Sequence, residues 1–213
     1  MMQPVSRPDE CNPFSTRFVR PGAIEYLFAE DENAEQLIER LSANGWRGAI
    51  VGPHGSGKST LLAMLVSRLN DRGIPVRWTS LHDGQRSLPR GWDRPVNPTA
   101  SLLLVIDGYE QLSRWSRWRL GHRCRRSGWG LLVTAHRKVA PPTIFETTPT
   151  QGLMRAVFDR VLPVGVTVLT PEDADNAFVR AGGNIREALF DLYDRYERRQ
   201  ILVHARTLAG LDP

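Results

Sequence analysis

The sequence predicts an α/β protein in which a parallel sheet lies between two layers of helices and a small helical domain follows. Two apolar runs, Leu102–Asp107 and Trp129–His136, are typical of central parallel strands that are buried on both faces. A glycine-rich loop at 52–60 separates a short apolar run from an amphipathic helical pattern. Beyond about residue 150 the apolar residues recur at helical spacing, which predicts the helical domain.

The length and composition narrow the protein class. A chain of 213 residues is long enough for one domain with a small additional unit. No apolar run approaches the length of a membrane span and the N-terminus lacks the apolar stretch of a signal peptide, so we expect a cytoplasmic protein with no membrane partner. The two cysteines, Cys11 and Cys124, lie far apart and show no disulfide or metal-ligand spacing.

The net charge of +5 is carried almost entirely by arginine. Lysine occurs only at positions 58 and 138, so 26 of the 28 cationic side chains are arginine. An arginine bias this general weakens any argument from arginine clusters to nucleic acid. Because the chain uses arginine for nearly every other cation, the lysine at position 58 is a stronger sign of a specific role.

The elements are expected in the following order. Phe14 and Phe18 in the N-terminal arm fit either stacking on a nucleotide base or packing of the arm on the protein core, and the second is favoured. We expect helices over 34–41, 58–69 and about 110–125, a long connection at 82–100, and strands over 46–51, 75–81, 102–107, 129–136 and 143–147. In the helix over 110–125, Trp115 and Trp118 are expected to face the core.

The loop at 52–60 carries the pattern G-x-x-x-x-G-K-[ST], which binds the phosphates of a nucleotide. The predicted nucleotide-binding residues are Gly52, Pro53, His54, Gly55, Ser56, Gly57, Lys58, Ser59 and Thr60. The glycines allow the loop to turn its N–H groups inward, and the dipole of the following helix attracts the same anion. Lys58 would reach the β- and γ-phosphates, and the Ser59 hydroxyl would bind Mg²⁺. The alternative is a glycine-rich turn that matches by chance, but the flanking strand and helix favour nucleotide binding.

Polar residues at the ends of two predicted strands complete the candidate site. Asp107 ends a buried strand, where a carboxylate can hold Mg²⁺ opposite Ser59; the alternative is a cap for the next helix. Glu110 fits two roles equally well, as the group that orients the attacking water or as a favourable charge in the first turn of a helix. Thr134 and His136, at the end of the next strand, fit either a contact to the γ-phosphate or a structural role.

The C-terminal third is expected to form three helices. Thr170-Pro171 begins one of them, and Asn184 caps the next with Glu187 at the reciprocal position. Arg186 lies in the first turn of that last helix, where the dipole disfavours a cation. A phosphate facing Arg186 would explain this placement, and an exposed arginine with a local acidic partner is the alternative.

These elements together resemble the AAA+ class of P-loop ATPases, in particular the compact type of replication initiators and ExeA-like proteins. Residues 52–60 are similar to the Walker A motif, 102–107 to Walker B, Thr134 to the sensor 1 residue and 182–189 to the sensor 2 segment. The resemblance implies the three-layer P-loop NTPase fold with a helical lid, and an Arg186 that touches the γ-phosphate. The domains implied are an arm and helix at 1–46, the α/β core at 47–150, the lid at 151–199 and a tail at 200–213.

The sequence departs from that class in three places, of which one is the region 82–100, which is short of a full helix. Asp107 is followed by Gly108 instead of a second acidic residue, so Glu110 is the nearest candidate for the catalytic base. Only residues 136–142 separate the sensor 1 strand from the next strand, too few for the helix that carries the arginine finger in this class.

The leading functional prediction is Mg-dependent ATP binding and hydrolysis that drives a conformational switch, with Glu110, Thr134 and Arg186 as catalytic residues. Two alternatives stay open: a nucleotide-binding regulatory module that does not hydrolyse ATP, and a small-molecule kinase. The expected cofactors are ATP and Mg²⁺. A protein partner or a second copy of the chain is compatible with the sequence, and the arginine-rich face of 114–126 also leaves nucleic acid open.

Overall fold

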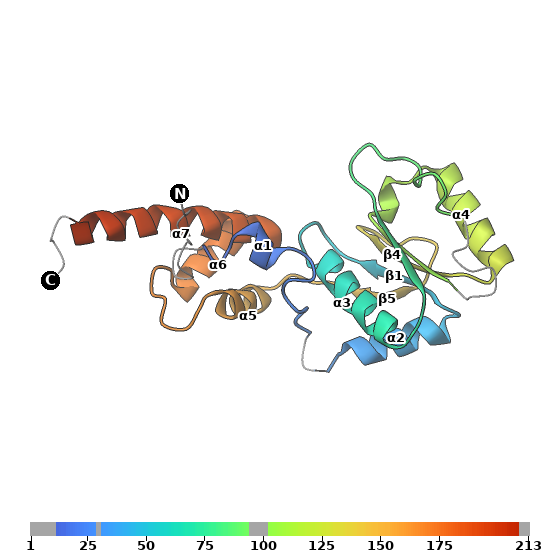
Figure 1. Cartoon of the computed structure of the whole chain (residues 1–213), viewed down its shortest axis with the longest axis horizontal. Helices are drawn as coiled ribbons and strands as arrows, with labels where there is room; N and C mark the ends of the chain where they lie inside the picture. The colour runs from blue at the N-terminus through green and yellow to red at the C-terminus, as the bar shows by residue number, and fades with distance from the viewer. Residues whose placement is uncertain (1–11, 29–30, 94–101, 209–213) are drawn as a thin grey trace, which may run out of the picture. The chain divides into compact units, whose positions relative to one another are not determined.

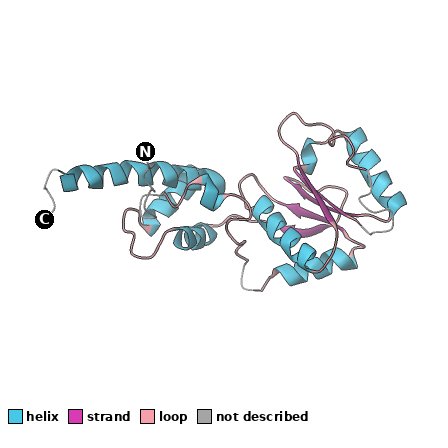
Figure 2. Ribbon diagram, in the orientation of Figure 1, coloured by secondary structure: helices cyan, strands magenta, loops and turns pink. Residues whose placement is uncertain are grey.

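The computed structural model describes residues 12–28, 31–93 and 102–208, and the chain divides into two compact units. An α/β unit comprises residues 28–148. A helical unit combines the described residues before 28 with those after 148. Figure 2 shows that the strands belong to the first unit and that the second is helical.

Within the described ranges, five parallel strands form one sheet in the order β2-β3-β4-β1-β5. The strands are β1 (Arg47–Val51), β2 (Val76–Ser80), β3 (Leu103–Asp107), β4 (Gly130–Ala135) and β5 (Thr143–Glu146). Each lies where the sequence predicts it. Because all the strands run in the same direction, their carboxyl ends lie at one edge of the sheet, where ligands bind in such folds.

Helices cover both faces of this sheet, which confirms the predicted three-layer α/β fold. Successive residues of β1 face opposite sides of the sheet. On one side, a Cβ on Gly48 would lie 2.9 Å from Leu41 of α2 (Ala34–Ala43). On the other side, Ala49 packs in the apolar cluster that includes Leu120 of α4 (Arg114–Ser127). Helix α3 (Lys58–Asp71) lies beside α2 (Figure 1). The connection over 82–93 holds no helix, as expected, and 94–100 lies outside the described residues.

The helix predicted over about 110–125 begins at a different residue in the structure and buries a different face. A short 3-10 helix, η2 (Tyr109–Gln111), precedes α4, whose N-cap is Ser113. The prediction that Trp115 and Trp118 face the core is wrong, because they are 63% and 61% exposed. The buried stripe of α4 consists of Leu120, Gly121 and Cys124, whose two small residues let the helix lie close to the sheet.

The helical unit is built around an apolar cluster that includes part of the N-terminal arm. It contains α1 (Thr16–Val19), α5 (Gln151–Val161), α6 (Pro171–Arg180) and α7 (Ile185–Leu208). Phe14 is 1% exposed and stacks on Phe158 at 5.9 Å, so the arm packs on a protein core and Phe14 is not available to a nucleotide base. Helix α7 continues beyond residue 199, where the sequence predicts a tail. No helix among the described residues has the length and apolar character needed to cross a bilayer.

The burial of Phe14 gives a first prediction. Phe14→Ala leaves a cavity between Phe158 and Tyr196 and is expected to lower the free energy of unfolding of the helical unit by about 3–5 kcal/mol. Phe18→Ala, which removes a ring that is 39% exposed under Arg17, should cost less than about 1 kcal/mol. Denaturant unfolding followed by circular dichroism measures both. Equal losses in the two variants would contradict the placement of the arm.

Candidate functional site

The loop after β1 has the geometry of an anion-binding turn. Gly55 and Gly57 have φ of +67° and +87°, values that other residues rarely adopt. Gly57 is the N-cap of α3 and supplies no side-chain hydrogen bond, so no cap covers the N–H groups of the first turn. A Cβ on Gly52 would lie 2.0 Å from Oγ1 of Thr147, so only glycine fits there.

Lys58 lies folded against the mouth of this loop. Its ammonium donates hydrogen bonds to the carbonyl oxygens of Gly52 (2.8 Å) and Pro53 (2.5 Å), and its Nζ is 3.4 Å from Nδ1 of His136. The side chain is buried although it carries a charge. A buried ammonium that is held by carbonyl oxygens is well placed to take an anionic partner.

Thr147, which follows β5, also holds the loop in place. Its Oγ1 lies 2.6 Å from Oγ of Ser56, and its backbone N–H donates to the carbonyl of Val51. Thr147 is not among the site residues that the sequence predicts. The available signal was its position directly after a short strand, because the end of a parallel strand beside β1 must lie next to the loop.

Asp107 and Thr134 form a second polar group at the same edge of the sheet. Oγ1 of Thr134 donates to Oδ1 of Asp107 at 2.5 Å and accepts from the N–H of Gly108 at 2.9 Å. Gly108 has φ of +83°, and a Cβ there would lie 2.7 Å from the carbonyl oxygen of Leu81. This close contact explains why no acidic residue directly follows Asp107.

Glu110, on η2, pairs with His136 just beyond β4. Oε1 of Glu110 lies 2.7 Å from Nε2 of His136, and the ring of His54 lies against the ring of His136, tilted by 31°, with centroids 3.5 Å apart. Burial, with the charges of Lys58 and His54, lowers the pKa of His136 against the opposing effect of Glu110. The neutral ring can then donate Nε2–H to Glu110 and turn the Nδ1 lone pair towards Lys58.

The chain resembles known proteins in a short part of its sequence and in its fold. No family model matches the chain. A stretch of 50 residues is 50% identical to the lipoprotein-releasing system ATP-binding protein LolD 2 of Rhodospirillum rubrum, and the match covers 22% of each chain.

Solved structures match a much larger part of the chain. A point mutant of RuvB from Thermotoga maritima superposes with a TM-score of 0.58 at 16% identity over 83% of this chain and 64% of that one. AMPPCP-bound DnaA from Aquifex aeolicus gives 0.53 at 17% identity over 86% and 69%. A DNA replication initiation factor gives 0.50 at 14% identity, and the chain spans 64% of its length. The chain has the three-layer α/β fold of P-loop NTPases.

This fold brings most of the predicted site residues together in the α/β unit. The loop at 52–60, Asp107, Glu110 and Thr134 all lie at the carboxyl edge of the sheet. Arg186 belongs to the helical unit, where it is exposed in the first turn of α7, and Asn184 caps that helix through the N–H of Glu187. A contact between Arg186 and a phosphate therefore stays a prediction.

The donor set suits a magnesium nucleotide. Gly55 and Gly57 give the loop its left-handed turns, and a buried ammonium lies at its mouth. Among the residues that the structure describes, no three His, Cys, Asp or Glu side chains gather into a metal site. One carboxylate and one hydroxyl, Asp107 and Ser59, fit an ion that takes its other ligands from phosphate and water, as Mg²⁺ does.

The lowered pKa of His136 predicts a pH dependence of stability. Unfolded His136 binds a proton at its ordinary pKa of 6.5, and the folded protein binds it only at lower pH. The unfolded state therefore takes up more protons in that range, and stability falls as pH falls below about 6.5. The melting temperature of His136→Gln should fall less between pH 7 and pH 5 than that of the wild type. His82→Gln, which removes an exposed histidine, is the control for the loss of an imidazole elsewhere on the surface. An unchanged slope in His136→Gln would contradict this account.

Proposed function

We propose that the chain binds Mg·ATP at the loop 52–60 and hydrolyses it to switch its conformation. The observation that carries the proposal is the buried Lys58 ammonium at the mouth of a glycine loop, at the same sheet edge as the Asp107–Thr134 pair. The P-loop ATPase fold supports nucleotide binding at this edge. One structural neighbour, DnaA of Aquifex aeolicus, was solved with AMPPCP bound, which supports a nucleotide as the ligand.

The cationic and the metal-binding residues of the site would have different roles. The loop amides and Lys58 would bind the phosphates and stabilise the negative charge that develops on the γ-phosphoryl group. Ser59 and Asp107 would hold Mg²⁺, which would neutralise phosphate charge and orient the γ-phosphoryl group for attack. Thr134 fixes Asp107 through its 2.5 Å hydrogen bond and, at the end of β4, would also serve the predicted sensor role.

Glu110 is the proposed base for the attacking water. Its Oε2 is buried and has no hydrogen-bond partner among the described residues, as expected of a carboxylate that binds a water during the reaction. Its Oε1 is engaged by His136, which would position the carboxylate. Because both residues follow strands of the sheet, the pair is anchored to a rigid element.

The helical unit is the proposed lid. Arg186, in the first turn of α7, would contact the γ-phosphate in the ATP-bound form and release it after hydrolysis. The nucleotide would in this way favour one arrangement of the two units. A second copy of the chain or a protein partner could respond to that arrangement.

A non-hydrolysing nucleotide-binding module is the second candidate. One observation favours it: Gly108 leaves no room for an acidic residue directly after Asp107, and Glu110 is held by His136. In that case ATP binding alone would switch the protein, and steady turnover would be absent.

Two substitutions test the proposed site. Lys58→Ala removes the buried ammonium and should weaken ATP binding by about 10- to 100-fold, because hydrogen bonds to charged groups contribute about 1.5–3 kcal/mol. Glu110→Gln should keep binding and slow turnover by about 100-fold, the typical contribution of a general base. Fluorescent-nucleotide titration and phosphate release measure the two effects.

Arg72→Ala, which removes an exposed cation at the end of α3, is the control and should change neither quantity. Turnover that is unchanged in Glu110→Gln would refute the role of Glu110. Binding that Lys58→Ala removes, together with no turnover in the wild type, would support the binding module instead.

A further inference from the structure

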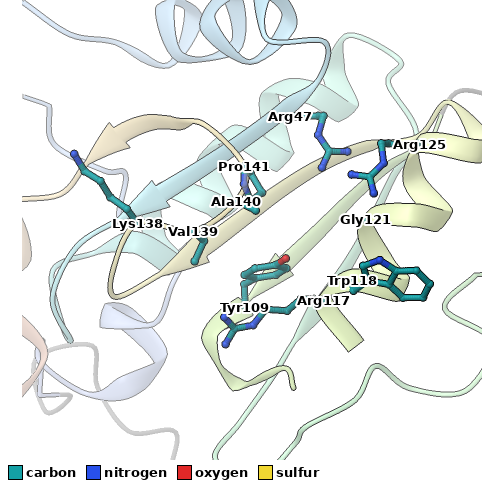
Figure 3. A pocket seen from close by; sticks show the side chains of 10 residues that line it. All are labelled: Arg47, Tyr109, Arg117, Trp118, Gly121, Arg125, Lys138, Val139, Ala140 and Pro141. Atoms are coloured by element: carbon teal, nitrogen blue, oxygen red, sulfur yellow. The ribbon is translucent and has the colours of Figure 1, made fainter. Parts of the chain in front are cut away.

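A groove lies on the side of the sheet that α4 covers, beside the connection from β4 to β5. The connection from β4 to β5, over 136–142, is a short segment without a helix, and its Val139 packs on the same apolar cluster as α4. A cavity of about 310 Å³ opens between that segment and α4. Figure 3 shows its lining, with Arg47 and Arg125 towards one end and Lys138 towards the other.

The groove carries positive charge that the carboxylates of the described residues leave largely unneutralised. Its cations are Arg47, Arg117, Arg125 and Lys138. Within the described ranges only Lys138 pairs with a carboxylate, Glu146 at 3.5 Å, and both side chains are largely exposed. Arg117 donates instead to the backbone carbonyls of Glu110 and Leu112, which carry no net charge.

The surrounding sequence strengthens this charge. Residues 111–145 contain no Asp or Glu, although 23 acidic residues in 213 would place about four in a stretch of that length. The arginine bias of the whole chain explains the number of arginines but not the lack of acids. The surface around α4 therefore attracts polyanions.

Two exposed tryptophans lie on the surface of α4. Trp115 and Trp118 are three residues apart and so share one face of α4, and Trp118 also lines the groove. The ring of His122 stacks on Trp118 at 5.6 Å with an interplanar angle of 10°, and the guanidinium of Arg119 lies 5.5 Å from the Trp115 ring. Large aromatic rings left exposed in this way mark a binding surface.

We propose that this groove and the Trp115–Trp118 face bind single-stranded nucleic acid. Phosphates would follow the row of cations, and unpaired bases would stack on the tryptophans, which is the combination that proteins use for single strands. A duplex hides its base faces and would leave the tryptophans unused. An acidic peptide could pair with the cations, but its carboxylate side chains offer no flat aromatic faces to the rings. The proposal uses none of the predicted ATP-binding residues and does not rest on the proposed function.

Titration of a fluorescent oligothymidylate of about 20 nucleotides, at several salt concentrations, tests the proposal. Trp118→Ala should weaken binding by about 5- to 100-fold because a stacked base is lost. Arg125→Ala should lower the slope of log K against log salt by about 0.7, the value for one phosphate contact in a single strand. Arg72→Ala removes the same charge from the opposite layer of helices and should leave both affinity and slope near wild type.

Competition identifies the ligand class. Unlabelled oligothymidylate and oligouridylate should displace the probe at similar concentrations, whereas a duplex of equal length and polyglutamate should be much poorer competitors. Trp118→Phe should retain binding because the ring is kept. Since Trp115 and Trp118 are exposed, their alanine variants should melt at the wild-type temperature. Binding that survives the double alanine variant, or polyglutamate that competes as well as the oligonucleotide, would overturn the proposal.

Discussion

The parallel direction of β1, β3 and β4 is the constraint on which the candidate site depends. It places the loop that follows β1, the carboxylate that ends β3 and the hydroxyl near the end of β4 at one edge of the sheet. These residues are far apart in the sequence, and no local preference would bring them together. The rigid sheet thus supplies the positioning on which phosphate chemistry depends.

At this edge the charges of three side chains are linked. Burial, together with the charge of the Lys58 ammonium, lowers the pKa of His136, and His136 in turn pairs with Glu110. A phosphate that draws Lys58 away from the carbonyls of Gly52 and Pro53 would change the field at His136 and, through it, the carboxylate. In the proposed mechanism, nucleotide binding and the position of the proposed base would therefore be coupled by electrostatics.

Local patterns predicted the fold well, and they selected residues that meet at the carboxyl edge of the sheet. The glycine loop, the strands and the absent helix after β4 follow from runs of residues that carry their own structural preference. The prediction for Trp115 and Trp118 failed because helical spacing shows which residues share a face but not which face is buried. On α4 the small residues Gly121 and Cys124 decide this, since they allow the closer approach to the sheet. Thr147 and the Glu110–His136 pair depend on contacts between distant elements, which one sequence does not display.

Calorimetric titration of the wild-type protein with ATP, with and without magnesium, tests the central claim most directly. The account predicts saturable heat corresponding to one nucleotide per chain, with affinity that falls when magnesium is removed, because one carboxylate and one hydroxyl bind the ion only together with the phosphates. No heat of binding in the presence of magnesium, or an affinity that magnesium does not change, would contradict it.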